Sequence, residues 1–316
     1  METAKTLQKA VIYFSNPDNC LNYMASRRWP NGAICPTCGR QDVSFLANQK
    51  KWQCKSAHAK RQFSVKTGTI FEDSPLGLDK WLIAVWMITN CKNGVSSYEV
   101  HRAIGVTQKT AWFMIHRIRV AMECGSFEKL SGEVECDETY IGGKSIDMRA
   151  KKRKEIKMTR GYEQKTGVMG MLQRGGKIRA KVIKHAFTRT LLGLVNQNIE
   201  YGSTVMTDDH GGYRNMSDED YIHEIINHAC EYVCGNVHTN SIENFWSLLK
   251  RSIKGTYVSV EPSHLQKYVE DQVFRYNERK GNDSERFHKI TSQLSSKRLT
   301  YAELTGKTPE ASLLQV

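Results

Sequence analysis

Three acidic residues of this chain could together hold divalent cations: Asp137, Asp208 and Glu243. Mg²⁺ and Mn²⁺ prefer oxygen ligands and leave coordination positions open for phosphate oxygens. Three carboxylates that converge on one point are therefore what a two-metal phosphoryl-transfer site requires. The metals of such a site activate a water or a hydroxyl group, so no protein nucleophile is needed. The alternative is that each acid is a solvated cap or one half of a surface ion pair, the usual role of a single carboxylate.

The sequence around each acid predicts where its side chain points. Residues 133–141 alternate as a strand, which places Asp137 on the face opposite the neighbouring apolar residues. Asp208 ends a second strand, and Asp209 must face the other way, so only one of these two can reach the metals. Glu243 lies in a helical segment, on the side opposite the apolar residues of that segment.

The chain from residue 131 to residue 253 has the alternation expected of an α/β domain. Strands are predicted over residues 133–141, 166–172, 177–186 and 203–208, and within 221–233. Helices are predicted over 188–199 and 239–253, where apolar residues recur at helical spacing. Arg174-Gly175-Gly176 is a hairpin turn between the second and third strands. The predicted order is three strands, a helix, two strands and a helix.

Four soft or borderline ligands near the N-terminus predict a zinc site. Cys35 and Cys38 form a Cys-x-x-Cys pair, and Cys54 and His58 follow on a second turn. Four such ligands from two tight turns can build a closed tetrahedral site that folds about 30 residues without an adequate core. The sequence therefore predicts a zinc ribbon over residues 31–75. The alternative is two unrelated buried cysteines and a surface histidine, because the second ligand pair is the weaker half of the pattern.

Two short helices after the ribbon could read DNA. A Ser-Ser-Tyr-Glu capping box opens the first helix, and Gly105 ends it. Thr107 caps the second helix, whose first residues Gln108, Lys109 and Thr110 stand where base contacts are usually made. A helix-turn-helix and an ordinary helical pair fit this segment equally well. Its place after a zinc ribbon in a basic chain favours the helix-turn-helix.

The composition excludes several classes of protein. The chain has 316 residues, and 46 Lys and Arg against 33 Asp and Glu give it a net charge of +13, which is typical of a nucleic-acid binder. Its longest apolar stretch, residues 81–88, is too short to span a bilayer, and its start carries no export signal. We therefore expect a cytoplasmic protein, in which the nine cysteines do not form a disulfide scaffold and the clustered ones indicate metal ligation.

Three motifs carry a resemblance to a known family. They are Val134–Lys144, then Thr207-Asp208 with Tyr213, then Val237–Arg251 followed by Gly255-Thr256-Tyr257. With these motifs the chain resembles the DDE transposases of bacterial insertion sequences. The type is the one with an N-terminal zinc ribbon, which is related to the eukaryotic Merlin elements. The likeness runs from about Cys35 to about Arg279, which is most of the chain.

This resemblance implies an α/β architecture with an RNase H-like, integrase-type catalytic core, in which Asp137, Asp208 and Glu243 hold Mg²⁺ or Mn²⁺. It also implies that the zinc ribbon and the helix-turn-helix recognise the terminal inverted repeats of a mobile element. Some members of the family use an asparagine as the third signature residue, which makes Asn240 a minor rival of Glu243. Many relatives have a cysteine one position after His58, so the fourth zinc ligand departs from the family pattern.

Basic and polar residues near these motifs are the predicted DNA contacts. Lys250 lies seven residues, or nearly two helical turns, beyond Glu243 and so points the same way. The resemblance places Lys250 against DNA beside the active site, and we count it with the catalytic residues. The predicted DNA-binding set is Gln108, Lys109, Thr110, Arg117, Lys144, His238, Asn240, Lys250 and Arg251. The basic run of residues 148–165 either follows the DNA backbone or is a solvated loop.

We divide the sequence into five regions. They are a leading helix (1–30), the zinc ribbon (31–75), the helix-turn-helix domain (76–128), the catalytic domain (129–285) and a C-terminal tail (286–316). The predicted function is metal-dependent cleavage and strand transfer at the inverted-repeat ends of an insertion sequence, with double-stranded DNA as partner. A DNA-binding regulator with an inactive core and an RNase H-like nuclease are the alternatives. Joining two element ends requires a synaptic complex, so we expect a homo-oligomer associated with the bacterial nucleoid.

Overall fold

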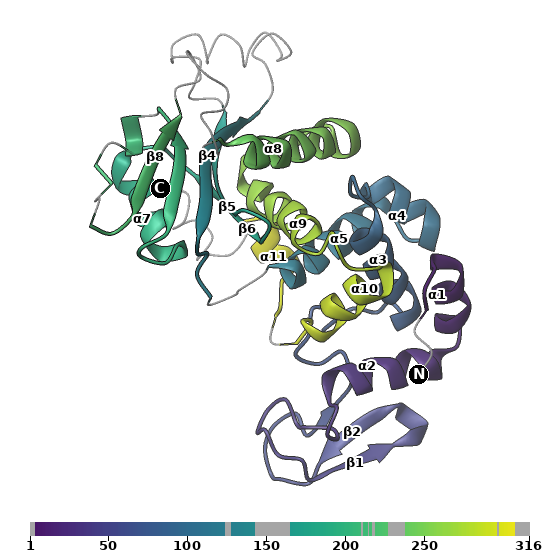
Figure 1. Ribbon diagram of the computed structural model, residues 1–316. Helices are drawn as coiled ribbons and strands as arrows, with labels where there is room; N and C mark the ends of the chain where they lie inside the picture. The colour runs from purple at the N-terminus through teal and green to yellow at the C-terminus, as the bar shows by residue number, and fades with distance from the viewer. Residues whose placement is uncertain are drawn as a thin grey trace. The chain divides into compact units, whose positions relative to one another are not determined.

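The computed structural model of the chain describes residues 4–123, 128–142, 165–209, 211–213, 215–216, 219–226, 238–295 and 297–306. The chain divides into two compact units, one formed by residues 1–123 with 280–316 and the other by residues 124–279 (Figure 1). Within the described ranges, no helix is both long enough and apolar enough to cross a membrane.

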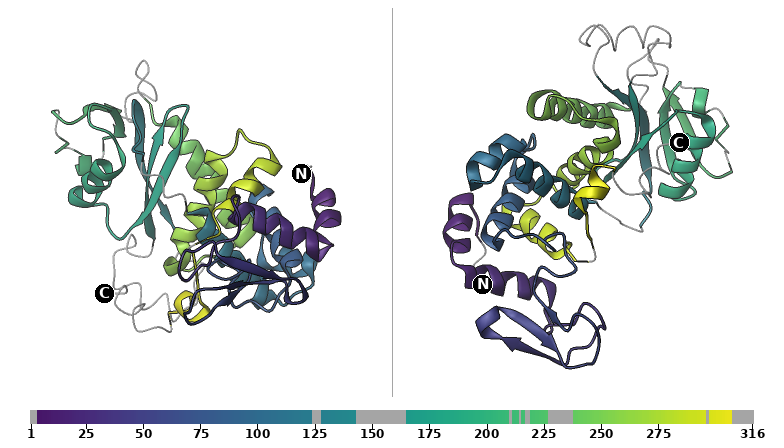
Figure 2. Two further views of the ribbon diagram at one scale, coloured as in Figure 1. Left: turned by 90° about the horizontal axis from the view of Figure 1, so that it is seen from below. Right: turned by 180° about the vertical axis from the view of Figure 1, so that it is seen from behind.

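The first unit is mainly helical. Its helices are α1 (Leu7–Phe14), α2 (Pro17–Arg28), α3 (Leu78–Asn90), α4 (Ser97–Ile104), α5 (Gln108–Met122), α10 (Asp283–Ser292) and α11 (Tyr301–Leu304). Helix α3 lies against α1, α2, α4, α5 and α10, and is therefore the centre of this unit (Figure 2). The predicted capping box opens α4, Gly105 ends it with a φ of 61°, and the Thr107 side chain caps α5. The helical pair thus forms where the sequence predicts it.

Both ends of the first unit differ from the sequence prediction. A single leading helix was expected over residues 1–30, but the structure has two, because Asn16 caps a new helix whose first residue is Pro17. Proline is favoured there since its missing N–H would have no partner in the first turn. Residues 286–316 were expected to be a tail. Instead, α10 belongs to the first unit, where Phe287 is 1% exposed and stacks on Tyr23.

The predicted ribbon is a small antiparallel sheet in the first unit. Its strands are β1 (Val43–Leu46), β2 (Lys51–Cys54) and β3 (Gln62–Phe63), with the short 3₁₀ helix η1 (Ala47–Gln49) between the first two. The rings of Trp29, Trp52 and Phe63 pack together on this sheet. Such a small aromatic cluster is a minimal core, so the sheet needs a further source of stability.

The second unit is built on a five-stranded sheet. Its strands are β4 (Glu133–Ile141), β5 (Thr166–Gln173), β6 (Ile178–Ile183), β7 (Thr204–Asp208) and β8 (Ile222–Ile226), in the order β6-β5-β4-β7-β8. Strand β5 is antiparallel to both β4 and β6, whereas β7 runs parallel to both β4 and β8. Helix α7 (Thr188–Asn198) covers one face, and α8 (Asn240–Ser252) and α9 (Leu265–Asn277) cover the other (Figure 1).

Short helical segments complete the second unit. They are the 3₁₀ helices η3 (Gly211–Tyr213) and η5 (Pro262–His264) and the π-helical turn η4 (Ile253–Tyr257), which continues α8. The order of strands and helices is the predicted one: three strands, a helix, two strands and a helix. The sequence periodicity therefore identified every strand of this sheet.

Two apolar clusters fix which way each residue of β4 faces. Val134 and Cys136 are buried under α7, whereas the cluster under α8 and α9 takes its strand residues from β5 and β6. The alternate residues Glu135 and Asp137 consequently face α8, as strand parity predicts. Gly170 lies opposite Asp137 on β5, and a Cβ atom there would come within 2.7 Å of the Trp246 ring. A glycine at this position lets α8 pack closely over the two acids.

Candidate active site

Asp137 and Asp208 lie at the same level on neighbouring parallel strands. The ladder between β4 and β7 ends with Glu135 paired to Met206, and Asp137 and Asp208 follow two residues later on their strands. Residues side by side on paired strands share a face, so both carboxylates lie on the α8 side. The two strands are no longer hydrogen-bonded to each other at this point. The carboxyl ends of parallel strands are where open sheets usually bind ligands.

Glu243 reaches this region from the first turn of α8. Its side chain is exposed, whereas Phe245 and Leu249 on the opposite side of the helix are buried, as predicted. The hydroxyl of Thr239 donates a hydrogen bond to Glu243 Oε1 over 3.4 Å. Asn240, the rival third ligand, is exposed as the first residue of α8. The packing of α8 therefore agrees with Glu243 as the candidate third metal ligand.

The three acids influence one another electrostatically. Burial raises the pKa of Asp137 from 3.8 to about 6, and the negative charges of Asp208 and Glu243 raise it as well. A hydrogen bond from Trp246 Nε1 to Asp137 Oδ2, 2.8 Å long, opposes this shift. Asp209 is exposed and by parity faces the opposite side of the sheet. Asp208 is thus the member of this pair that faces Asp137.

The chemistry of the three side chains suits a hard divalent cation. Burial is the main cause of the high pKa of Asp137, and a cation would relieve the repulsion by Asp208 and Glu243 that adds to it. Both oxygens of Asp137 already accept hydrogen bonds, from Trp246 Nε1 and the Glu138 N–H, and each oxygen keeps a second lone pair. Within the described residues, the three acids are not among the side chains that lie close enough together to share an ion as they stand. Shared coordination therefore requires a side-chain rotation, which the exposed Glu243 allows.

Replacing Asp137 by asparagine should stabilise the protein in Mg²⁺-free buffer. The unfolded carboxyl loses its proton near pH 4 and the folded one near pH 6, so the folded state is progressively destabilised between these values. We expect Asp137→Asn to raise the free energy of unfolding on the order of 2 kcal/mol at pH 7 and hardly at all at pH 4. Urea unfolding at both pH values measures this, with Asp209→Asn as the exposed control. A gain of equal size at pH 4 would contradict it.

Glu138 and Trp246 are site residues that the sequence patterns do not single out. Glu138 follows Asp137 but faces the other side of β4, where the hydroxyl of Tyr213 donates to its carboxylate. Burial raises the pKa of Glu138 to about 7, with Asp137 and Asp208 contributing. Trp246 is apolar in pattern and fits the buried side of α8, so nothing in its spacing shows that its indole N–H reaches Asp137.

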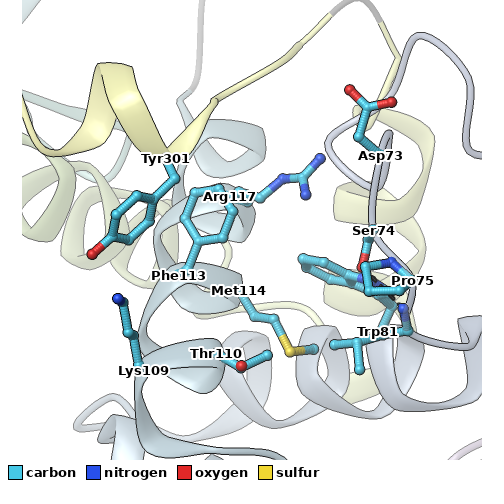
Figure 3. A pocket seen from close by; sticks show the side chains of 11 residues that line it. Asp73, Ser74, Pro75, Trp81, Lys109, Thr110, Phe113, Met114, Arg117 and Tyr301 are labelled. Carbon is cyan, nitrogen blue, oxygen red and sulfur yellow. Dashed lines mark hydrogen bonds between the residues drawn. The ribbon is translucent and has the colours of Figure 1, made fainter. Parts of the chain in front are cut away.

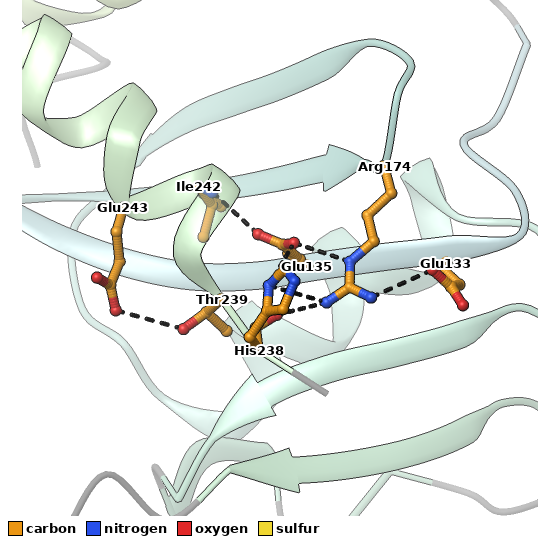
Figure 4. A network of polar contacts seen from close by, with 7 residues as sticks. All are labelled: Glu133, Glu135, Arg174, His238, Thr239, Ile242 and Glu243. Carbon is orange, nitrogen blue, oxygen red and sulfur yellow. Dashed lines mark hydrogen bonds and ion pairs between the residues drawn. The ribbon is translucent and has the colours of Figure 1, made fainter. Parts of the chain in front are cut away.

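A polar network around the buried Glu135 lies beside Glu243 (Figure 4). The guanidinium of Arg174 contacts Glu133, Glu135 and His238. In the sequence, Arg174 stands out only as a turn residue, and no pattern gives Glu135 a role. The one available signal is that Glu135 lies two residues before Asp137 and must share its face of β4.

The structure brings the four predicted zinc ligands together. Within the described residues, Cys35, Cys38, Cys54 and His58 are the one group of potential ligands close enough to share an ion, with all ligand atoms within 4.8 Å of one another. Cys35 Sγ lies 3.5 Å from His58 Nε2, and Cys38 Sγ lies 3.6 Å from Cys54 Sγ. Three thiols and one imidazole are a donor set typical of structural zinc. His58 is therefore well placed as the fourth ligand.

Local hydrogen bonds prepare these side chains for metal binding. His58 Nδ1 lies 2.6 Å from the Ala59 carbonyl oxygen and must donate to it, which leaves the lone pair of Nε2 directed at the cysteines. Partial desolvation raises the pKa of Cys54, but the His58 side chain, when it is protonated, and the Ser56 backbone N–H outweigh it and lower the pKa to about 6. A thiol with a lowered pKa is available as the thiolate that binds zinc.

The predicted DNA contacts of the first unit have different environments. Gln108 donates to Ser97 Oγ over 2.8 Å and so ties the start of α5 to α4. Lys109 is exposed and lies over the ring of Tyr301. Lys109 and Thr110 line one side of a pocket of about 340 Å³, which also includes Trp81 and Tyr301 (Figure 3). The N-terminal turn of α5 is thus partly accessible.

Arg117 is not placed to contact DNA, contrary to the sequence prediction. It is 4% exposed, and its Nη2 donates to the Glu72 carbonyl oxygen over 2.6 Å. Its guanidinium also lies over the rings of Trp81 and Phe113, each at 5.4 Å. Burial lowers its pKa. Arg117 therefore stabilises the helical unit from within.

The predicted DNA contacts of the second unit cluster on α8 and just before it. Asn240, Lys250 and Arg251 are exposed, and His238 is half-buried in the network of Arg174. Lys250 is on the exposed side of α8, as Glu243 is, which agrees with the predicted helical spacing. Lys144 and the basic run of residues 148–164 lie outside the described residues.

Comparison with known proteins finds a family match in each unit. Residues 129–277 match the family model of the ISXO2-like transposase domain, and residues 15–60 match that of the transposase zinc-ribbon domain. An uncharacterised protein in the transposable element ISH50 of Halobacterium salinarum is 30% identical over 250 residues, which cover 75% of this chain and 83% of that protein. The cysteine and histidine cluster lies within the matched ribbon, and Asp137, Asp208 and Glu243 all lie within the matched transposase domain. The chain therefore belongs to the DDE transposases of insertion sequences that carry an N-terminal zinc ribbon.

Proposed function

We propose that this protein cuts DNA at the inverted-repeat ends of an insertion sequence and transfers the freed 3′-hydroxyl into target DNA. The observation that carries the proposal is the shared level of Asp137 and Asp208 at the carboxyl ends of two parallel strands, with Glu243 on the helix above them. The sheet order β6-β5-β4-β7-β8, with helices on both faces, supports an RNase H-like core.

Each of the three acids has a distinct part in the proposed site. Asp137 and Asp208 are fixed by their strands, so they define the position of the metals, and Glu243 closes the site from α8. When bound there, Mg²⁺ or Mn²⁺ would supply the Lewis acid that activates the attacking hydroxyl and stabilises the leaving oxygen. Lys250, exposed on the same helix, would neutralise the phosphate backbone of the bound DNA.

The first unit is proposed to recognise the element ends. The turn between α4 and α5 suits a helix-turn-helix, in which Lys109 and Thr110 stand at the start of the second helix. The zinc ribbon precedes this pair in the same unit and would add further contacts to the repeat. Bringing two ends together requires more than one protomer, so we propose that the active species is a multimer.

DNA binding should weaken steeply as salt increases. Each phosphate contact made by a lysine or arginine releases about 0.9 counterions, and the chain has a net charge of +13. A protein with six or more such contacts should lose about 10³-fold in affinity between about 50 and 200 mM salt. Fluorescence anisotropy with a labelled duplex of the repeat measures the slope. A flat response would show that phosphate contacts do not dominate binding.

A strand-transfer assay tests the proposed function. Labelled duplexes from the DNA that flanks the coding region are incubated with Mg²⁺ or Mn²⁺ and either the wild-type protein or Asp208→Asn. Joined products from the wild type alone are expected. Cutting without joining would favour a nuclease, and salt-sensitive binding without any chemistry would favour a regulator.

A further inference from the structure

A buried carboxylate joins the strand of Asp137 to the helix of Glu243. The side chain of Glu135 is 0% exposed. Its Oε2 accepts the backbone N–H of Ile242, the third residue of α8, over 3.0 Å, and its Oε1 accepts the Nε–H of Arg174 over 2.9 Å. A buried carboxylate is tolerated only where it is fully paired, because its desolvation costs several kcal/mol. Both oxygens of Glu135 meet this requirement.

Glu135 takes the place of the usual N-terminal cap of α8. The first N–H groups of a helix have no partner within the helix, and the N-cap side chain normally accepts one of them. Thr239, the N-cap residue, makes no such bond, and its hydroxyl donates to Glu243 instead. The free N–H of Ile242 is then satisfied from β4, where the negative charge of Glu135 also complements the positive end of the helix.

Arg174 extends this connection to His238, two residues before α8 (Figure 4). Its Nη2 donates to the carbonyl oxygen of His238 over 2.9 Å and lies 3.0 Å from His238 Nδ1. His238 Nδ1 also lies 3.4 Å from Glu135 Oε1, so the ring lies between the guanidinium and the carboxylate. Nη1 of the same group donates to Glu133 over 3.2 Å. One side chain therefore fixes both the backbone and the ring orientation at the entry to α8.

We propose that Glu135 and Arg174 are positioning residues. Together they form a clamp that holds Glu243 and His238 in place relative to Asp137. The inference rests on the proposed function, since it concerns the same site. Glu135 and Arg174 act through Glu243 and His238. An error of about 1 Å in the placement of a catalytic group can lower a reaction rate about 100-fold. Loss of the clamp should therefore reduce catalysis without reducing DNA affinity.

The first test measures the clamp without any catalysis. Glu135→Gln keeps the size of the side chain and one acceptor oxygen but removes the charge. The matched control is Glu133→Gln, which neutralises the other carboxylate that contacts Arg174. The side chain of Glu133 is 43% exposed. Hydrogen exchange of the full-length zinc-loaded chain should be about 10-fold faster over residues 238–246 in Glu135→Gln than in the control, with similar melting temperatures. Equal exchange in the two variants would overturn the proposal.

The second test measures strand transfer at saturating DNA. Glu135→Gln should lower the rate about 100-fold with unchanged DNA affinity, while Glu133→Gln stays within about 3-fold of the wild type. Arg174→Lys retains the charge but cannot reproduce the planar fork of the guanidinium, so it should also lower the rate. This variant tests the clamp independently if Glu135→Gln does not fold. A fully active Arg174→Lys would overturn the clamp. Inactive wild type with altered exchange in Glu135→Gln would instead refute the proposed function and leave the clamp intact.

Discussion

Replacing Cys35 by serine is expected to abolish zinc binding and to unfold the ribbon. Serine is a poor zinc ligand, and bound zinc contributes about 10–16 kcal/mol to the folding of small zinc domains. The β1-β2-β3 sheet has only a small aromatic cluster around Trp52 to replace that contribution. Metal analysis should fall from one zinc per chain to none, and limited proteolysis should cut within residues 31–75. The second unit has its own core and should remain folded.

Cys91→Ser is the matched control for the zinc experiment. Cys91 is an exposed cysteine of the same unit and is not a member of the ligand group. This variant should keep one zinc per chain and the wild-type pattern of proteolysis. Unchanged zinc content in Cys35→Ser would show that the metal site is elsewhere.

Replacing Glu243 by glutamine is expected to stop strand transfer while the protein still binds DNA. Glutamine keeps the shape of the side chain and can still accept the hydrogen bond from Thr239, but it lacks the negative charge that a divalent cation requires. We expect the rate to fall by about 10³-fold, which corresponds to about 4 kcal/mol in activation free energy. The joined product is quantified on denaturing gels, and DNA affinity is measured in parallel.

Glu261→Gln makes the same chemical change outside the site. Glu261 is an exposed residue of the second unit, before η5. Its variant should transfer strands at the wild-type rate. Full activity in Glu243→Gln would move the third ligand elsewhere, and Asn240, one turn earlier on α8, would be the first residue to examine.

Much of the second unit could be predicted because its signals are local. Alternation along β4 predicts the face of Asp137, and the spacing along α8 predicts that Glu243 is opposite Phe245. The Cys-x-x-Cys pair and the second ligand pair likewise predict the zinc site. In each case the relevant residues are close in sequence, so backbone periodicity or ligand spacing decides where the side chains point.

The rest depends on contacts between residues distant in sequence. Glu135 meets Arg174 and Ile242, which are 39 and 107 positions away, and no local pattern indicates either contact. Arg117, predicted to contact DNA, is a second case in which distant contacts decide. The structure buries it against Trp81 and the Glu72 carbonyl. The local sequence does not determine whether a long basic side chain is exposed or buried, because this depends on the packing of the whole unit.

The most direct test of the central claim is Mn²⁺ binding to the DNA-bound protein, measured by calorimetry in the wild type and in single-acid variants. If Asp137 and Asp208 form one metal site, Asp137→Asn and Asp208→Asn should each weaken Mn²⁺ binding at least about 10-fold, because each removes a charged ligand. Asp209→Asn, one residue away on the opposite face, should bind Mn²⁺ as the wild type does. Equal affinities in all four proteins would contradict the assignment of these carboxylates as the metal ligands.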